Sequence, residues 1–96
     1  MPNYFVYILG NKRPTLYVGM TNNLAKRFYE HQQGLNDSFT KKYKIHSLLH
    51  YEVFETPKQA IIREKQLKNM KRIEKINLIK INNPYFKNLS KKIDSF

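Results

Sequence analysis

The sequence contains no cysteine, and only seven of its 96 residues are acidic. Without cysteine, the chain cannot form disulfides, thiolate nucleophiles or zinc ribbons. It also has no HExxH motif and no paired carboxylates, which excludes zinc hydrolases and glycosidases of the usual kinds. No apolar run reaches the length of a membrane span, and the N-terminus lacks the zones of a signal peptide. We therefore expect a soluble, cytoplasmic protein with no membrane partner.

The shortage of acids gives the chain a strong positive charge. Eighteen lysines and arginines stand against seven aspartates and glutamates, for a net charge of +11. A basic domain of this size attracts polyanions, of which nucleic acid is the usual one in the cytoplasm. Bias from an AT-rich genome would also enrich lysine, asparagine and isoleucine. Because bias alone should not leave so few acids, we favour nucleic-acid binding.

What is present suffices for one small folded domain, since 41% of the residues are hydrophobic. Aromatic and β-branched runs predict strands over 4–9, 16–19 and 46–54, the first two forming a hairpin. A polar loop is expected over 34–43. The order of hairpin, helix, third strand and further helices predicts an α+β fold, with a small sheet covered by helices.

Capping signals delimit the predicted helices. The first should begin after Thr21 or Asn22 and run to about residue 33. The second should begin at Thr56, with proline at the first helical position, and a third should span 72–81 with Ile73, Ile76 and Ile79 buried. We expect the domain to occupy residues 1–89 and the basic segment 90–96 to be a frayed tail.

Several residues around the hairpin and helices could carry chemistry, although each has an ordinary alternative. Tyr7 and Tyr17 lie on strands, where aromatic side chains normally pack a sheet face. His31 follows Arg27 by one helical turn and could be a spectator. Glu64 could simply pair with Lys68 four residues later. Together, however, these residues could supply a base, a charge clamp and a metal ligand for phosphoryl transfer.

The same set of residues resembles a known family. Phe5-Val6-Tyr7, then Tyr17-Val18-Gly19, then Arg27, His31 and Glu64 are similar in order and spacing to a GIY-YIG nuclease domain. The small standalone bacterial members are more similar still, through REKQLK at 63–68 and NPYFKNL at 83–89, and the catalytic domain of the excision-repair incision subunit is a further relative. The resemblance covers nearly everything from residue 4 to 89.

The resemblance implies a GIY-YIG fold, with a three-stranded antiparallel sheet flanked by helices, and metal-dependent cleavage of a phosphodiester. Tyr17 would activate the attacking water with Tyr7 beside it, and His31 would be an alternative or auxiliary base. Arg27 would hold the scissile phosphate through a planar fork that lysine cannot copy. Glu64 would be the one direct protein ligand of Mg²⁺ or Mn²⁺.

Other positions of the family pattern are less well defined in this chain. Gly19 would let the backbone pass close to the site or adopt a positive φ angle. Asn83, or alternatively Asn77, would be the family's late asparagine. Met20 stands where several members have lysine, so one positive contact is missing.

The chain has no separate DNA-binding module, so specificity would come from its own surface or from a protein partner. Lysines in the 39–44 loop and along the later helices would contact phosphates without reading sequence, as nucleic-acid-binding residues. The candidates are Lys42, Lys65, Lys68 and Lys71. Their alternative is a solvated helix face.

The sequence thus predicts a Mg²⁺-dependent DNA endonuclease, with branched or nicked DNA among its substrates. The implied settings are DNA repair, recombination or mobile-element processing. The alternative is a non-catalytic, basic nucleic-acid-binding module on the same fold. Whether DNA or RNA is bound is left open by the residues themselves.

Overall fold

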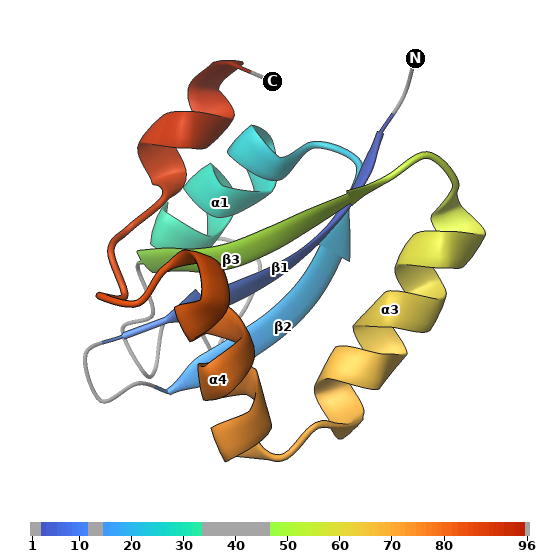
Figure 1. Ribbon diagram of the computed structural model, residues 1–96. Helices are drawn as coiled ribbons and strands as arrows, with labels where there is room; N and C mark the ends of the chain where they lie inside the picture. The colour runs from blue at the N-terminus through green and yellow to red at the C-terminus, as the bar shows by residue number, and fades with distance from the viewer. Residues whose placement is uncertain (1–2, 12–14, 34–46, 96) are drawn as a thin grey trace.

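The computed structural model of the chain (Figure 1) describes residues 3–11, 15–33 and 47–95. The loop expected over 34–43, and Lys42 with it, lie outside the described residues. Within the described ranges, no helix is both long and apolar enough to cross a bilayer.

The sheet has three strands, and the first of them is central. β1 (Tyr4–Gly10) lies between β2 (Leu16–Thr21) and β3 (Ser47–Phe54), and both pairings are antiparallel. The predicted α+β fold with a three-stranded antiparallel sheet is therefore confirmed. Tyr7 is opposite Gly19 on one side and Tyr51 on the other. Since β2 and β3 are the edge strands, side chains on either of them can be approached from outside the sheet.

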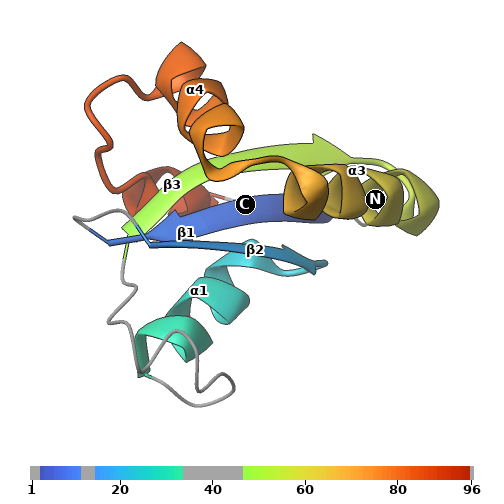
Figure 2. The ribbon, with the colours of Figure 1, turned by 90° about the horizontal axis from the view of Figure 1, so that it is seen from below.

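The helical segments of the described chain lie on both sides of this sheet. They are α1 (Leu24–Gln33), α3 (Pro57–Asn69), α4 (Arg72–Asn82) and the 3₁₀ segment η1 (Ser90–Ser95). Seen from below the view of Figure 1, α1 lies on one face of the sheet and α4 on the other (Figure 2). Figure 1 shows α3 running along the side of the sheet where β2 lies, and α3 contacts all three strands.

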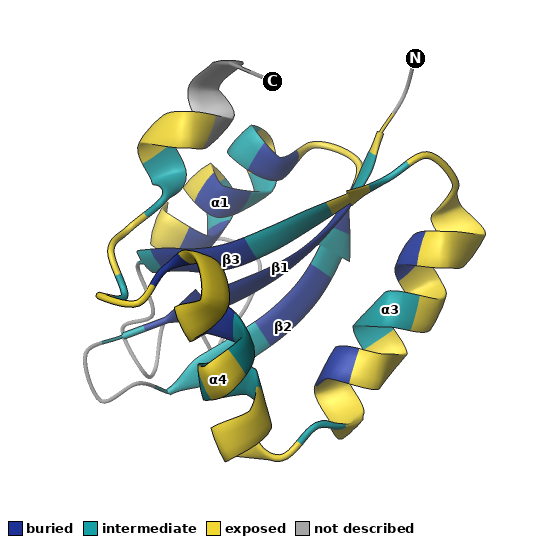
Figure 3. Ribbon diagram, viewed as in Figure 1, coloured by how far each residue is buried: buried dark blue, intermediate teal, exposed yellow. Residues whose placement is uncertain are grey.

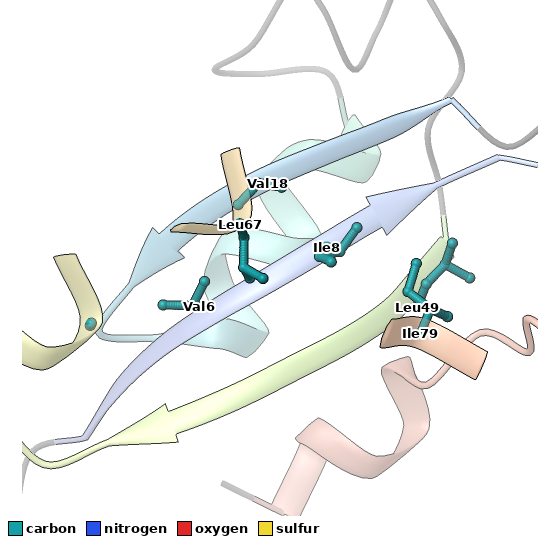
Figure 4. Packing of buried hydrophobic residues seen from close by; sticks show 7 residues of the cluster. Val6, Ile8, Val18, Leu49, Leu67 and Ile79 are labelled. Carbon is teal, nitrogen blue, oxygen red and sulfur yellow. The ribbon is translucent and has the colours of Figure 1, made fainter. Parts of the chain in front are cut away.

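Alternation along the strands separates two apolar clusters. Figure 3 shows that buried residues lie on the strands and on single positions of the helices that cover them. Phe5, Tyr7 and Leu9 face α1, where they pack with Leu24 and Phe28. The intervening residues of β1 face α3 and α4. This second cluster, drawn in Figure 4, consists of Val6, Ile8, Val18, Leu49, Ala60, Leu67 and Ile79.

β3 changes its alternation through an irregularity at the level of Ile8 and Leu9. Leu48 is opposite Leu9 and His50 is opposite Ile8, so Leu49 is an extra residue on β3. Leu48 packs with the α1 cluster and Leu49 with the α3–α4 cluster. Because directly opposite residues share a face, His50 lies on the α3–α4 side, where strict alternation from Leu49 would not place it.

The helix caps confirm one sequence prediction and correct another. Thr56 caps α3, since its side chain accepts a hydrogen bond from the Gln59 amide, and Pro57 follows at the helix start. At α1 the cap is Asn23, not Thr21 or Asn22. Asn23 Oδ1 accepts from the Lys26 amide at 3.1 Å, while Thr21 Oγ1 accepts from the Asn23 amide. The hydroxyl of Thr21 thus bonds the residue before the helix, and that residue, Asn23, is the N-cap.

One further expectation about the C-terminal half is wrong. Ile73 is 59% exposed, and only Ile79 of the three isoleucines expected to be buried on α4 is fully so. Residues 90–95, within the segment expected to be a frayed tail, form η1, which contacts α1. The Leu89 amide donates to Leu48 O at 2.7 Å, which ties the chain to the outer edge of β3 just before η1 begins.

Candidate active site

A tyrosine and a histidine meet beneath the sheet on its α1 face. Tyr7 points toward α1 because odd-numbered residues of β1 face that way, and His31 lies on the stripe that α1 buries together with Leu24 and Phe28. A buried hydrogen bond of 3.0 Å joins the Tyr7 hydroxyl to His31 Nε2. The two side chains are 1% and 2% exposed. Two polar side chains are therefore removed from water and held by each other.

Tyr17 extends this pair toward the open edge of the sheet. Its ring centroid lies 5.0 Å from that of His31 and 6.4 Å from that of Tyr7, and the His31 contact is edge-to-face. Tyr17 is half-buried on the edge strand β2, so it is the member of the trio that reaches solvent. We call Tyr7, Tyr17 and His31 the tyrosine–histidine cluster.

Gly19 makes room for the cluster. It lies opposite Tyr7, and a Cβ atom at Gly19 would overlap the Tyr7 hydroxyl and ring. Its backbone does not need a positive φ, so of the two reasons considered from the sequence, close approach is the one that applies. Gly19, the last residue of Tyr17-Val18-Gly19, is thus required because Tyr7, the last residue of Phe5-Val6-Tyr7, lies directly opposite it.

Arg27 lies on α1 one turn before His31, on the same side of the helix. Its side chain is 39% exposed, and Nε lies 3.7 Å from Glu30 Oε1. A surface ion pair at this distance is weak, worth about 0.5 kcal/mol or less. An incoming phosphate could therefore displace Glu30 from the guanidinium.

Glu64 approaches from α3, on the other side of the sheet from α1. Its Oε2 lies 3.6 Å from Lys68 Nζ, and its side chain is 22% exposed. Lys68 in turn lines an open cavity of about 360 Å³ together with Lys75 and residues 16–18 of β2, Tyr17 among them. The pairing with Lys68 that the sequence offered as the ordinary alternative therefore exists. Of this pair, Lys68 is the member that lines the cavity beside Tyr17.

The donor atoms near this cavity suit only a particular kind of cation. No group of three or more histidines, aspartates and glutamates gathers anywhere in the described ranges. A cation at Glu64 would thus have one carboxylate and would fill its other positions with water or substrate oxygen. That pattern fits Mg²⁺, which keeps most of its water, and does not fit a closed zinc site.

The remaining predicted site residues are of two kinds, exposed lysines and an asparagine with a structural role. Lys65, Lys68 and Lys71 are exposed on α3 and just after it, where they can meet an anion. Asn83 is only 5% exposed and serves the backbone. Its Nδ2 donates to Leu49 O and Lys87 O, and its Oδ1 accepts from the Lys87 amide. These bonds fasten the end of α4 to β3 on the α3–α4 face, away from the tyrosine–histidine cluster.

Sequence reasoning missed an ion-pair network on the α3–α4 face. Arg63 donates to Glu52 through Nε at 2.8 Å and Nη2 at 3.1 Å, and His50 Nε2 lies 2.8 Å from the same carboxylate. Burial alone would raise the pKa of Glu52, but the hydrogen bonds and charges of His50 and Arg63 outweigh it and lower the pKa to about 2. A carboxylate within a mostly apolar strand was the signal available, because such a group needs a partner.

Comparison with known families agrees with this geometry. The model of the GIY-YIG catalytic domain matches residues 3–77, which include both tyrosines, Gly19, Arg27, His31 and Glu64. The match spans well over half of the chain. The protein therefore belongs to the GIY-YIG family, a family of nuclease-type domains.

Within that family the chain is similar to small proteins named UPF0213. It is 40% identical to one from Syntrophus aciditrophicus over 85% of this chain and 95% of the relative. It is 36% identical to one from Clostridium perfringens over 94% and 97%. The NMR structure of a UPF0213 protein from Bacillus halodurans matches with a TM-score of 0.58 and 26% identity, over 93% of this chain and 95% of that chain.

Proposed function

We propose that the protein is a divalent-metal-dependent endonuclease that hydrolyses phosphodiester bonds in DNA. The observation that carries the proposal is the tyrosine–histidine cluster. A buried hydroxyl–imidazole hydrogen bond lies behind a half-exposed tyrosine on an edge strand, beside a cavity lined by two lysines. If these polar side chains were buried for packing alone, they would not need to lie next to an open, basic surface.

Burial assigns different parts to the members of the cluster. Tyr17 reaches solvent, so its hydroxyl is the one that can contact an attacking water. His31 and Tyr7 are sealed behind it and position it, and they offer hydrogen-bonding atoms along which the water's proton can be passed. The family resemblance made Tyr17 the first candidate for activating the water, with His31 as an alternative or auxiliary base. The difference in exposure favours Tyr17 as the group that touches water.

Arg27 and Glu64 would bind the charged groups of the reaction, Arg27 the phosphate and Glu64 the metal ion. Arg27 offers two parallel N–H donors to the scissile phosphate once Glu30 is displaced. Glu64 would hold Mg²⁺ or Mn²⁺ after leaving Lys68, whose ammonium is then released toward the substrate. A bound ion of this kind stabilises the charge that grows on the phosphoryl oxygens.

The substrate is a polyanion held by charge more than by sequence. Lys65 and Lys68 lie on α3, which runs along the β2 edge, Lys71 follows α3 and Lys75 lies on α4. The net charge of +11 favours DNA at low salt. Contacts of this type fix position and carry no base readout. Preference for nicked or branched DNA would then come from shape, or from a protein partner. Repair, recombination or mobile-element processing would supply such DNA.

One observation favours the alternative of a non-catalytic nucleic-acid-binding module. Glu64 already has a partner in Lys68, and the described residues offer it no second carboxylate. In that alternative the ion pair is permanent and the lysines bind phosphate without cleavage. The two functions differ in one consequence, because only the nuclease needs Glu64 for its activity.

The test is nicking of supercoiled plasmid by the purified protein with Mg²⁺ or Mn²⁺, beside Glu64→Ala and Tyr17→Phe. The nuclease predicts nicking that EDTA abolishes and that each variant loses by at least about 100-fold. Lys65→Ala is the matched control on α3, expected to weaken DNA binding slightly while retaining cleavage. Retarded but uncut plasmid with all four proteins, on branched DNA as well, would support the binding module instead.

A further inference from the structure

α3 is held to the sheet by very few apolar contacts. Ala60 and Leu67 are its only fully buried residues, while Ile61 and Ile62 are 42% and 49% exposed. Figure 4 shows Leu67 over the strands beside Val6 and Ile8. Two contacts seven residues apart form a line along the helix. Such a line fixes where the helix lies but resists rotation about the helix axis only weakly.

Arg63 supplies a contact away from that line. It reaches across to β3, where two of its nitrogens bond the two oxygens of Glu52 at 2.8 and 3.1 Å. A planar guanidinium bonded to both oxygens constrains orientation as well as distance. His50 lies 2.8 Å from the same carboxylate and holds it from the strand side. The Arg63–Glu52 clamp therefore fixes the rotation of α3 relative to the sheet.

The same rotation determines where Glu64 points. With 3.6 residues per turn, Arg63 lies about 60° to one side of Ala60 and Glu64 about 40° to the other. Because β3 and β2 are opposite edges of the sheet, fixing Arg63 toward β3 turns Glu64 toward β2. Lys68, one turn after Glu64, lines the cavity with Tyr17 of β2, as this rotation requires.

We infer that Arg63 is a positioning residue, which by gripping Glu52 on β3 presents the Glu64 carboxylate to the β2 edge beside Tyr17. The inference rests on the proposed function for its consequence in metal binding, but its geometric part does not. Loss of the clamp lets α3 rotate, so that Glu64 and Lys68 leave the edge together. Metal binding should then weaken even though every candidate ligand is still present.

Arg63→Gln is the test variant, because glutamine cannot span both oxygens of Glu52 as a charged fork. Its matched control is Glu74→Ala, which removes the bond from the Lys71 amide to Glu74 Oε1, 2.8 Å long at the start of α4, and leaves α3 untouched. Both variants lose stability, so a change common to both reflects stability alone. Arg63→Lys keeps the charge without the fork and serves if the glutamine variant does not fold.

Two NMR readouts separate rotation from metal binding. In metal-free protein, nuclear Overhauser cross-peaks between Lys68 and residues 16–18 report the rotation of α3. With added Mn²⁺ alone, broadening of amides near Glu64 and Tyr17 reports affinity. We expect the cross-peaks to disappear in Arg63→Gln. This variant should need at least about tenfold more Mn²⁺ than the wild type for the same broadening, as is typical when a residue that orients a metal ligand is removed. Arg63→Lys should be intermediate, and Glu74→Ala should behave like the wild type.

The outcomes distinguish the inference from the proposed function. Overhauser cross-peaks and Mn²⁺ affinity that are the same in Arg63→Gln as in Glu74→Ala would overturn the inference, whatever the nicking assay gives. If the wild-type protein neither nicks DNA nor binds Mn²⁺, the proposed function fails. In that case, disappearance of the cross-peaks in Arg63→Gln alone would still support the clamp, and their persistence would refute it.

Discussion

The two faces of the sheet each bury a histidine, and the contrast between the two shows how this small chain divides its tasks. On the α1 face, His31 meets two tyrosines and the cluster leads to an edge strand. On the α3–α4 face, His50 meets a carboxylate that an arginine already grips. Hydroxyl and imidazole groups can pass a proton between them. A charge-paired carboxylate instead holds two elements together.

The contrast suggests that one face performs chemistry while the other sets the position of a helix. The proposed site would need both tasks at the β2 edge, because it would take Tyr17 from one face and Glu64 from α3, where Glu64 pairs with the cavity residue Lys68. Changes confined to one face can therefore show whether the stability or the activity that depends on the other face also changes.

Gly19→Ala should be the most damaging change on the α1 face. The added methyl overlaps the Tyr7 hydroxyl and ring, so Tyr7 must leave His31 or the strands must separate. We expect a loss of up to about 3 kcal/mol in the free energy of unfolding, together with loss of nicking. Urea denaturation and the plasmid assay measure the two effects.

Gly10→Ala is the matched comparison for that change. Its methyl would meet mainly the end of the Leu49 side chain, on the α3–α4 face, and a side-chain end can move aside. We expect a smaller loss of stability and full nicking by the folded protein. Equal loss of nicking in both variants would show that the α1 face has no special part in cleavage.

Acid should weaken the α3–α4 face first. The pKa of Glu52 is lowered from 4.5 to about 2 in the folded protein, so the carboxylate adds stability above pH 4.5 and loses it as the pH falls toward 2. The expected loss is about 2 kcal/mol by pH 3. Denaturant midpoints between pH 7 and 3 measure it. Glu52→Gln should remove this part of the pH dependence, and an unchanged profile would contradict the assignment.

Tyr7→Phe should have the smallest effect on folding. It removes the hydroxyl bonded to His31 but keeps the ring, so we expect a loss of about 1 kcal/mol in stability. Nicking should fall further than this loss of folded protein can account for. Nicking rates corrected for the folded fraction separate the two. If the variant is as active as the wild type, Tyr7 has no part in cleavage.

Much of the fold could be predicted from the sequence because local signals and packing agree there. β-Branched and aromatic runs became strands, and Thr56 with Pro57 began a helix where expected. A tyrosine on each strand of the hairpin, together with the family resemblance, also predicted that Tyr7, Tyr17 and His31 belong to one site, and the three lie together in the structure. The sequence could not tell which residue caps α1, because the hydroxyl of Thr21 orders Asn23 instead of starting the helix itself.

What escaped prediction depends on contacts between distant elements. The extra residue on β3 turns His50 toward α3, and no local pattern marks it. Glu52 and Arg63 are 11 residues apart and belong to different elements, so helix or strand spacing does not link them. Asn83 resembled a site residue by its place in the chain, yet its bonds fasten the end of α4 to β3.

The most direct test of this division compares His31 with His50. Single-turnover nicking of supercoiled plasmid would be measured for His31→Gln and His50→Gln, each corrected for its folded fraction. The account predicts at least about 100-fold slower nicking for His31→Gln. It predicts a rate within about threefold of wild type for His50→Gln, because Arg63 keeps both contacts with Glu52. Equal rates for the two variants, or a slower rate for His50→Gln, would contradict it.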